Sequence, residues 1–379
     1  MIYIHAILIV IFSIYTGWML AIIFGWLRRN NKNITSSNTR NSLSVLIPYR
    51  NEQENIPLLL KSLSDLQYSI EAVEFIFIND HSIDDSAETL MLGLLNFPFP
   101  YKLISLEENI FGKKRAIEAG VLEAAHSVIV TTDVDCIHSK NWLHEINRLI
   151  DSESQFIIGS VINKKKSGVL ANLQQIESLL LAGITVGSAK LKTPLLCSGA
   201  NLSYTKALFN KLQPYKNNCN ILSGDDMFFL EKIIREHDCH VEISSNSIVE
   251  TEGAKSFTEM VSRSVRWASK SSKLEMSLST VFGAIVLSIN YSMLFMTVLV
   301  ILDIDSIVFF IKLCAVKTIV DVLFLVLLAK RYGRYQTIMY FPIMVVFYPF
   351  YLFIVSLATV FSSPGWKGRL EVNERNQGI

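Results

Sequence analysis

Two aspartates follow a short apolar run in the first half of the chain, in the sequence Val128-Ile129-Val130-Thr131-Thr132-Asp133-Val134-Asp135. The β-branched run predicts a buried strand, and the carboxylates come at its end. Burying a carboxylate is costly unless a positive charge meets it, so the pattern favours Asp133 and Asp135 as ligands of Mg²⁺ or Mn²⁺ bound with a diphosphate. The alternative is a solvated pair in a loop before a helix that begins near Ser139.

Polar side chains also follow two other predicted strands. The first strand leads into Arg50 and Glu52, and the second leads into Asp80. Asp80 could hydrogen-bond the base or the ribose of a nucleotide. Lys113 stands at a predicted helix start, where its ammonium and the helix N-terminal amides would meet the phosphates. The alternative for Lys113 is a solvated first-turn lysine, because two further basic residues follow it.

The segment that holds these residues alternates between strands and helices. The sequence predicts strands over 43–47, 73–78, 101–106 and the run that ends at Asp133, and helices over 53–66, after Asp84 and over 112–125. This alternation predicts an α/β domain with a mostly parallel sheet and helices on both faces. Ligands of such sheets bind outside the carboxyl ends of the strands, where the polar residues stand.

The composition is too apolar for an ordinary soluble domain. Of 379 residues 50% are hydrophobic and 18% charged, and the mean hydropathy is +0.35. The apolar residues must therefore be segregated, and they gather in four runs that predict membrane-spanning helices: 2–27, 279–302, 307–329 and 337–361. We expect an N-terminal transmembrane helix (1–27), a polar domain (28–278), C-terminal transmembrane helices (279–361) and a tail (362–379). The net charge of +1 gives no reason to expect nucleic acid.

Charged residues near the apolar runs set the expected orientation. Basic residues follow the first run, at Arg28, Arg29 and Lys32, and separate the last two runs, at Lys330, Arg331 and Arg334. The loop between the second and third runs is acidic, with Asp303 and Asp305. By the positive-inside rule, residues 28–278 are expected in the cytoplasm of a multi-pass plasma (inner) membrane protein. Parity places the tail outside, although its basic residues suit the inside. The five cysteines show no metal-ligand spacing and are expected to be reduced.

An ordered series of short motifs runs through residues 35–145: Pro48-x-Arg50-Asn51-Glu52, Asn79-Asp80, Gly112-Lys113-x-x-Ala116, Asp133-x-Asp135 and Trp142-Leu143. The series resembles the family 2 glycosyltransferases. The resemblance implies a Rossmann-like GT-A fold of the nucleotide-diphospho-sugar transferases and inverting transfer from a nucleotide-sugar donor. It also implies a donor and metal site, in which Asp133 and Asp135 hold the metal and these residues bind the nucleotide: Pro48, Arg50, Glu52, Asp80, Lys113 and Asp133.

The resemblance continues in two motifs of the second half. Cys197-Ser198-Gly199-Ala200-Asn201-Leu202 resembles the family's small-residue loop near the acceptor, which implies acceptor contacts from Gly199, Ala200 and Asn201. Its alternative is a tight turn before a helix. Ser223-Gly224-Asp225-Asp226 resembles the family's Gly-Glu-Asp motif, whose final aspartate is the catalytic base. That role falls on Asp226, with Asp225 in place of the glutamate, and the alternative is a pair of helix caps.

A last motif, Arg263-Ser264-Val265-Arg266-Trp267, resembles the Gln/Arg-x-x-Arg-Trp motif of hyaluronan, chitin and cellulose synthases and ceramide glucosyltransferases. The resemblance implies that Arg266 clamps the diphosphate and that Trp267 stacks under the acceptor. A basic helix lying on anionic lipid is the alternative. The apolar stripe over 169–186 favours a core helix over a membrane contact. Lys317 and Asp321 are spaced to pair inside the third run.

Together these patterns predict a membrane-anchored inverting glycosyltransferase that moves a sugar from a nucleotide-diphospho-sugar, with a UDP-sugar expected, to a lipid acceptor. The cofactor would be a divalent metal, and the partners would be the nucleotide-sugar, a lipid or glycan acceptor and the membrane. A processive polysaccharide synthase is the alternative within the enzyme class. A non-catalytic, membrane-tethered nucleotide-sugar sensor or assembly subunit is the alternative of another class.

Overall fold

A computed structural model describes residues 2–28, 41–150, 154–218, 221, 224–236, 240–271, 277–361, 365–366 and 369–370. Its contacts divide the chain into two compact units. The first, called here the membrane-helix unit, contains Met1–Arg29, Asn163–Leu195 and Gly253–Pro364. The second, the α/β unit, contains Asn30–Ile162, Leu196–Glu252 and Gly365–Ile379. The sequence predictions for Arg29, Lys32, Cys219, Ser223, Cys239 and most of the tail lie outside the described residues.

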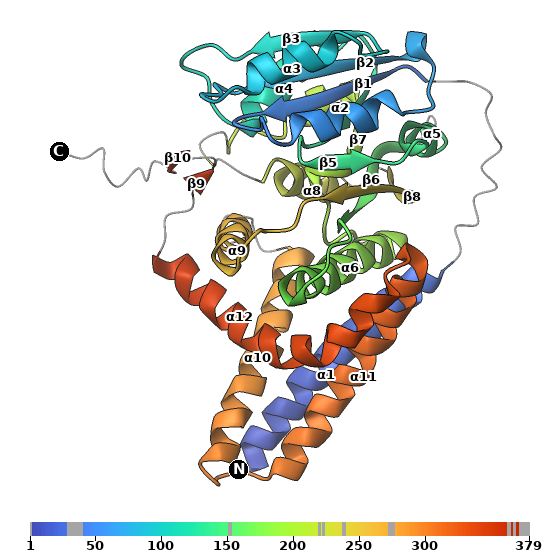
Figure 1. The fold of residues 1–379 in the computed structure, drawn as a ribbon. Coiled ribbons are helices and arrows are strands. Elements are labelled where there is room, and N and C mark those ends of the chain that lie inside the picture. The colour runs from blue at the N-terminus through green and yellow to red at the C-terminus, as the bar shows by residue number, and fades with distance from the viewer. Residues whose placement is uncertain are drawn as a thin grey trace. The chain divides into compact units, whose positions relative to one another are not determined.

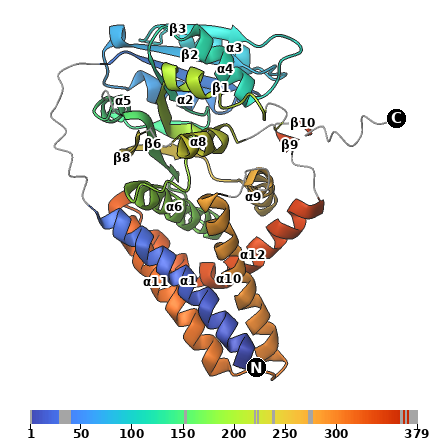
Figure 2. The same ribbon diagram turned by 180° about the vertical axis from the view of Figure 1, so that it is seen from behind.

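The α/β unit is built on an eight-stranded sheet with the order β3-β2-β1-β4-β7-β6-β8-β5 (Figures 1 and 2). The first four strands are β1 (Leu43–Tyr49), β2 (Val73–Asn79), β3 (Tyr101–Ser105) and β4 (Val128–Thr131). β1 pairs in parallel with β2 and β4, and β2 pairs in parallel with β3. Every residue of β1 is buried, as expected for a strand covered on both faces.

The other half of the sheet differs from the predicted parallel pattern. It contains β5 (Cys136–His138), β6 (Ser154–Asn163), β7 (Leu202–Thr205) and β8 (His240–Thr251). β7 runs antiparallel to β4 and to β6, and β5 runs antiparallel to β8. The sheet is therefore mixed, because the strict alternation of strand and helix that enforces parallel pairing ends after β4.

Helices pack on both faces of the sheet. They are α2 (Ile56–Ser64), α3 (Ser86–Leu94), α4 (Lys113–Glu123), α5 (Trp142–Asn147), α7 (Lys206–Leu212) and α8 (Asp225–Arg235), with short 3₁₀ turns η1 (Ile70–Ala72) and η2 (Gly199–Asn201). Apolar side chains of α2, α3 and α5 form one core with Leu43, Val45 and Ile47 of β1. α4 packs on the opposite face, where its Gly120 lies against Leu46. The alternation of side chains along β1 thus divides the core in two.

Within the part of the chain that the structure describes, the membrane-helix unit contains seven helical elements. They are α1 (Ile2–Leu27), α6 (Val169–Lys190), α9 (Phe257–Ser271), α10 (Leu278–Ile301), α11 (Ile307–Tyr332), η3 (Tyr335–Tyr340) and α12 (Phe341–Phe361). Four stretches of the described residues are long and apolar enough to cross a membrane: α1, α6, α10 and Tyr335–Phe361. Of these, α6 has the most buried window, which fits the predicted core helix. α11 is as long as α1 but contains Lys312, Lys317 and Asp321.

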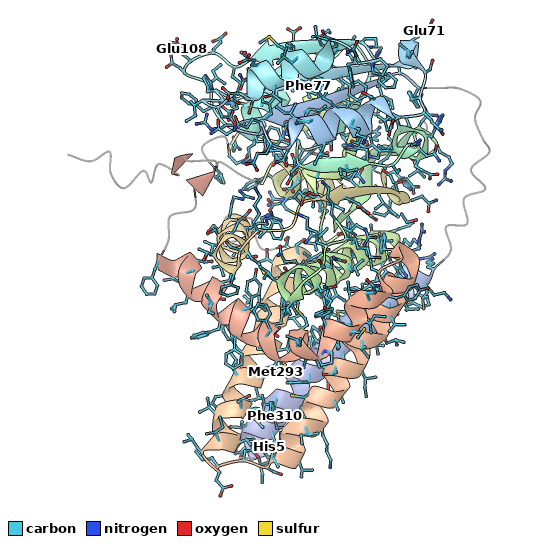
Figure 3. All side chains as sticks on the ribbon, viewed as in Figure 1. His5, Glu71, Phe77, Glu108, Met293 and Phe310 are labelled. Atoms are coloured by element: carbon cyan, nitrogen blue, oxygen red, sulfur yellow. The ribbon has the colours of Figure 1, made fainter. Side chains whose placement is uncertain are left out.

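Polar groups join the helices of this unit at two levels. The predicted pairing of Lys317 with Asp321 is confirmed, with Nζ 2.6 Å from Oδ2, and Tyr15 of α1 donates to Asp321 Oδ1 at 2.7 Å. His5 of α1 lies with its Nε2 2.8 Å from Asp305 Oδ2 in the loop between α10 and α11. Figure 3 shows His5 and Phe310 at the same end of these helices. Both contacts fix the register of α1 against α11 or its preceding loop.

Candidate active site

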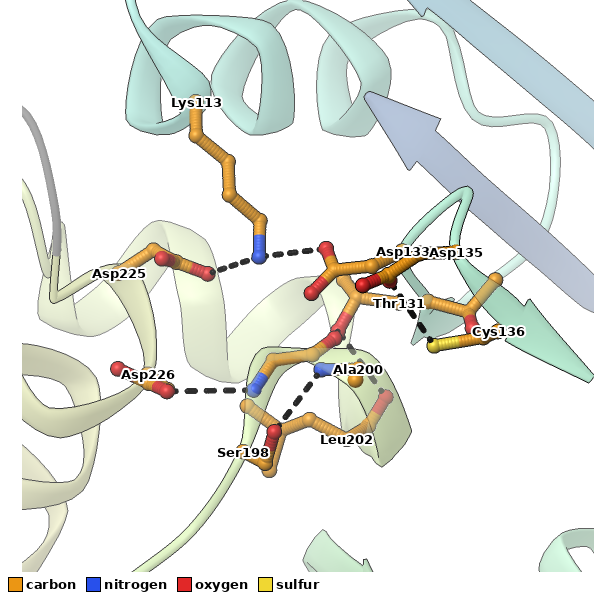
Figure 4. Close-up of polar contacts among 12 residues, drawn as sticks. Lys113, Thr131, Asp133, Asp135, Cys136, Ser198, Ala200, Leu202, Asp225 and Asp226 are labelled. Atoms are coloured by element: carbon orange, nitrogen blue, oxygen red, sulfur yellow. Dashed lines mark hydrogen bonds and ion pairs between the residues drawn. The ribbon is translucent and has the colours of Figure 1, made fainter. Parts of the chain in front are cut away.

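Lys113 joins the two acidic motifs of the α/β unit. Its Nζ lies 2.7 Å from Asp133 Oδ1 and 3.2 Å from Asp225 Oδ2 (Figure 4). Lys113 begins α4, Asp133 follows β4, and Asp225 begins α8. Three elements far apart in the sequence therefore place one ammonium between two carboxylates. The structure thus brings together Lys113, the aspartates after β4 and the aspartates of α8.

The electrostatics of this cluster keep the lysine charged. The Lys113 side chain is only 15% exposed, and burial alone would lower the pKa of its ammonium. Asp133 and Asp225 outweigh that effect and raise the pKa above its usual value. Three carboxylates, those of Asp133, Asp225 and Asp226, therefore act on the charge of the Lys113 ammonium.

Asp135 is held by a residue that the sequence analysis missed. Thr251 Oγ1 donates a hydrogen bond of 3.0 Å to Asp135 Oδ2, and the Cys136 thiol lies 3.7 Å from Oδ1. Thr251 ends β8 and stands opposite Cys136 in the antiparallel pairing of β5 with β8. Burial, followed by Asp135 and Asp133, raises the pKa of the Cys136 thiol, so it stays protonated and can donate.

The loop η2 forms the wall beside the aspartates of α8. The Gly199 amide lies 3.4 Å from Asp226 Oδ2, and Thr131 Oγ1 donates to the Gly199 carbonyl at 2.8 Å. A Cβ at Gly199 would lie 2.5 Å from Asp225 Oδ2 and 3.1 Å from Lys113 Nζ. A side chain at this position would therefore displace the ion pair, which explains why a glycine fits here.

Asn201, predicted to contact the acceptor, has its amide fully used inside the protein. Its Nδ2 donates to the carbonyls of Ser160 and Ser247, and its Oδ1 accepts from Trp142 Nε1. The side chain anchors η2 to the sheet core, and its direct contact with an acceptor stays a prediction. Ala200 is also buried, and Gly199 is the residue of the loop whose amide lies next to Asp226.

The two aspartates of α8 occupy its first turn. Gly224 precedes them with φ of 88°, a left-handed conformation that favours glycine. The Asp226 Oδ1 accepts the Met227 amide at 2.8 Å, while its Oδ2 faces η2. A helix N-terminus favours negative charge, so these carboxylates suit the first turn of α8, while the N-cap itself is Gly224 and has no side-chain cap hydrogen bond.

Asp80 and Arg50, predicted to bind the donor, hold the loops at the ends of β1 and β2. Asp80 is 0% exposed, and its Oδ2 accepts the Gly112 amide at 3.0 Å. Arg50 donates to the carbonyls of Asp80 and His81, each at 2.7 Å. These contacts fix the chain just before Lys113. The contacts that the sequence predicts between a nucleotide and Asp80 or Arg50 stay predictions.

The remaining predicted residues have other surroundings. Pro48 lies inside β1, and Glu52 accepts from Asn55 Nδ2 at 2.7 Å. Arg266 and Trp267 lie on α9 of the membrane-helix unit, and Trp267 is 42% exposed. Their predicted roles toward diphosphate and acceptor stay predictions.

The donor set suits a hard divalent cation. Asp133 and Asp135 offer carboxylate oxygens, and an ammonium already lies against Asp133, so the position tolerates positive charge. The described residues hold no ready-made cluster of three or more His, Cys, Asp or Glu ligands. That fits Mg²⁺ or Mn²⁺, which commonly take one or two carboxylates and complete their shell with phosphate oxygens and water.

Comparison with known proteins identifies this architecture. Residues 44–213 match the model of glycosyl transferase family 2. The undecaprenyl-phosphate 4-deoxy-4-formamido-L-arabinose transferase of Yersinia enterocolitica is 32% identical over 122 residues, which are 31% of this chain and 36% of that protein. The same enzyme of Pectobacterium atrosepticum is 30% identical over 135 residues, 35% of this chain and 40% of that protein.

A solved structure resembles the chain over more of its length. The mannosyltransferase from Pyrobaculum calidifontis, in complex with GDP-Man and Mn²⁺, has a TM-score of 0.60 and 14% identity, covering 94% of this chain and 99% of that one. The match over residues 44–213 bears out the predicted resemblance to the family 2 glycosyltransferases, and the solved structure bears out the predicted GT-A fold. The aligned part spans little more than a third of the bacterial relatives' own lengths.

Proposed function

We propose that this chain is a membrane-anchored inverting glycosyltransferase that moves a sugar from a nucleotide-diphospho-sugar, with a UDP-sugar as the expected donor, to a lipid acceptor. The observation that carries the proposal is the contact of Lys113 with both Asp133 and Asp225, which brings the two acidic motifs together and supports a shared site for donor and acceptor. The names of the bacterial relatives, which act on undecaprenyl phosphate, support a lipid acceptor.

The reaction requires one bond to form as another breaks. An acceptor oxygen attacks the anomeric carbon of the donor sugar, and the bond from that carbon to the nucleoside diphosphate breaks on the opposite face. Asp226 takes the proton of an acceptor hydroxyl. An ionised lipid phosphate would bring no proton, so the role proposed for Asp226 applies to an acceptor that attacks through a hydroxyl group of the lipid.

Charge on the departing diphosphate must be balanced. Asp133 and Asp135 would hold the divalent metal, which supplies electrostatic stabilisation of the leaving group when bound. The Lys113 ammonium contributes a fixed positive charge at the start of α4, beside the helix N-terminal amides. Thr251 keeps the Asp135 carboxylate oriented.

The proposed location is the inner membrane, with several spans and the α/β unit in the cytoplasm. The apolar helices α1, α10 and α12 support membrane insertion. Basic residues after the first span and at the end of α11 support the orientation through the positive-inside rule.

The test uses membranes from cells that express the wild type or Asp133→Asn, incubated with Mn²⁺ or Mg²⁺ and a panel of labelled nucleotide sugars. We expect metal-dependent label in the organic phase with the wild type and a loss of about 100-fold or more with Asp133→Asn. High-mass label in the aqueous phase would instead identify a polysaccharide synthase. Nucleotide binding without transfer of label to either the organic or the aqueous phase would contradict the enzyme assignment.

A further inference from the structure

The residue before the first metal-site aspartate contacts a buried histidine. Thr132 Oγ1 lies 2.7 Å from His138 Nε2, and Ser62 Oγ of α2 lies 3.2 Å from His138 Nδ1. The Thr132 side chain is completely buried, and His138 is only 6% exposed. Both ring nitrogens therefore have hydroxyl partners inside the protein, one from α2 and one from the loop that carries the aspartates.

The partners determine which nitrogen carries the proton. The Ser62 hydroxyl donates to the Leu59 carbonyl at 2.9 Å, and a carbonyl can only accept. The Ser62 oxygen must then accept from His138 Nδ1–H. In this tautomer Nε2 has no hydrogen, so it accepts from the Thr132 hydroxyl. The bonds form a directed chain from Thr132 through His138 and Ser62 to the backbone of α2.

Packing holds the ring in this position. The His138 and Trp142 rings lie 4.1 Å apart between centroids, and Trp142 Nε1 is itself fixed by Asn201 Oδ1 at 3.0 Å. Burial lowers the pKa of His138 to about 3, so the ring stays neutral at any working pH. Loss of the hydrogen-bond chain through protonation is therefore not expected near neutrality.

Thr132 and His138 stand at the two ends of one short segment. Between them lie Asp133 and Asp135, and the segment leaves β4 and returns to the sheet as β5. The Thr132–His138 hydrogen bond closes this segment, and a further backbone bond of 3.3 Å joins the Cys136 amide to the Asp133 carbonyl. Loosening the closure would let the two carboxylates change their spacing.

We propose that His138 is a positioning residue of the metal and donor site, holding residues 132–138 closed so that Asp133 and Asp135 meet a divalent cation and diphosphate at a fixed spacing. This inference rests on the proposed function. Groups that orient metal ligands without touching the metal commonly change metal affinity by about 10- to 100-fold. A histidine that served only as core packing would affect stability alone.

Two substitutions separate these roles. In His138→Gln the amide lies where Nε2 was, so it can still accept from Thr132, whereas in His138→Asn the amide lies where Nδ1 was and can reach only Ser62. Full-length protein in detergent is titrated with UDP and with GDP, in Mn²⁺ and in EDTA. We expect His138→Gln to stay within about threefold of the wild-type Kd in Mn²⁺ and His138→Asn to bind about tenfold more weakly, with little change in EDTA.

A second pair of variants covers the case in which the histidine variants fail to fold. Thr132→Val removes the hydroxyl at constant shape and should weaken Mn²⁺-dependent binding like His138→Asn, while Thr132→Ser should restore it. Equal Kd values for Thr132→Val, Thr132→Ser and the wild type would overturn the inference. An equal loss of Mn²⁺-dependent nucleotide affinity in His138→Gln and His138→Asn would also overturn the inference.

A ligand-free measurement keeps this inference separate from the proposed function. Amide hydrogen exchange over Val134–Cys136 should be faster in Thr132→Val than in Thr132→Ser, because only the former opens the closure. If the wild type binds no nucleotide with Mn²⁺, the proposed function fails. Independently of nucleotide binding, an unchanged rate of amide hydrogen exchange in Thr132→Val would contradict the closure of residues 132–138.

Discussion

At the scale of single residues, Lys113 is the group on which the acidic site depends. Asp133, Asp225 and Asp226 all act on its charge, and its ammonium contacts the first two. Like charges this close destabilise one another unless a cation intervenes. Lys113 therefore supports the folded arrangement before any ligand arrives, and a bound metal and diphosphate would enter a site whose carboxylates are already placed.

Thr251 gives a prediction at this scale. Thr251→Val removes the hydroxyl that donates to Asp135 Oδ2 while keeping the branched shape. We expect the concentration of Mn²⁺ needed for half-maximal nucleotide binding to rise by about tenfold or more, because an oriented ligand loses its partner. Thr251→Ser is the matched control and should bind nearly as well as the wild type. Equal Mn²⁺ dependence in Thr251→Val and the wild type would show that Asp135 needs no such partner.

The sequence identified the charged residues of the site but not their supports. Asp133, Asp135, Lys113, Asp225 and Asp226 stand in short motifs, where residue type and spacing carry the signal. Thr251 lies more than a hundred residues after Asp135 and reaches it only through the register of β5 with β8. A lone threonine at the end of a strand carries no local pattern that could predict this contact.

At the scale of elements, η2 connects the sheet to α8. Thr131 of β4 holds the Gly199 carbonyl, and the Gly199 amide faces Asp226. Asn201 fixes the end of the same turn to the core. The loop is therefore a 3₁₀ turn fixed to the sheet core beside Asp226, and its predicted contact with an acceptor stays a prediction.

Gly199→Ala tests this turn. The added Cβ would lie 2.5 Å from Asp225 Oδ2, so the carboxylate must move and its contact with Lys113 must change. We expect sugar transfer to fall by about 10- to 100-fold, because small misplacements at a reacting centre are costly. The unfolding temperature should change little, since the displaced atom ends a side chain. Gly17→Ala, where nothing lies within 4 Å, is the control, and equal activity of both variants would contradict the role of η2.

The parallel half of the sheet was predictable from alternating strands and helices, and β1 to β4 follow that prediction. The second half was not, because β5 has only three residues and β6 to β8 pair across long sequence separations. Hydrophobic alternation identifies a strand but does not name its partner. The arrangement of β5 to β8 therefore depends on pairing between strands distant in the sequence, which local sequence patterns do not reveal.

At the scale of the whole molecule, the chain enters its membrane-helix unit three times. α1, then α6, then α9 to α12 contribute to it, so α6 and α9 belong with the apolar helices although the sequence placed them within residues 28–278. Hydropathy predicted α1, α10 and α12 directly. It also predicted a span over 307–329, which is helical as α11 but is not among the four stretches of the described residues that are apolar enough to cross a membrane. It could not assign α6, which is apolar enough for a membrane and buried enough for a core.

The Lys317–Asp321 pair gives a prediction for this unit. The two side chains are 11% and 8% exposed, so Asp321→Leu leaves a buried ammonium without its partner. We expect a loss of about 3 kcal/mol or more in unfolding free energy measured in detergent. The double variant Lys317→Met with Asp321→Leu should recover most of that loss, because no charge remains unpaired. A double variant as unstable as the single one would show that the pair itself stabilises the helices.

The most direct test of the central claim compares Asp226→Asn with the wild type and with Asp65→Asn, an exposed aspartate at the end of α2. Transfer of labelled sugar and the Kd of the nucleotide in Mn²⁺ are measured on the same preparations. The account predicts that Asp226→Asn loses transfer by about 10²- to 10⁴-fold with an unchanged Kd, while Asp65→Asn matches the wild type. Retained transfer by Asp226→Asn would contradict a catalytic base at this position and would indicate an acceptor that is already ionised.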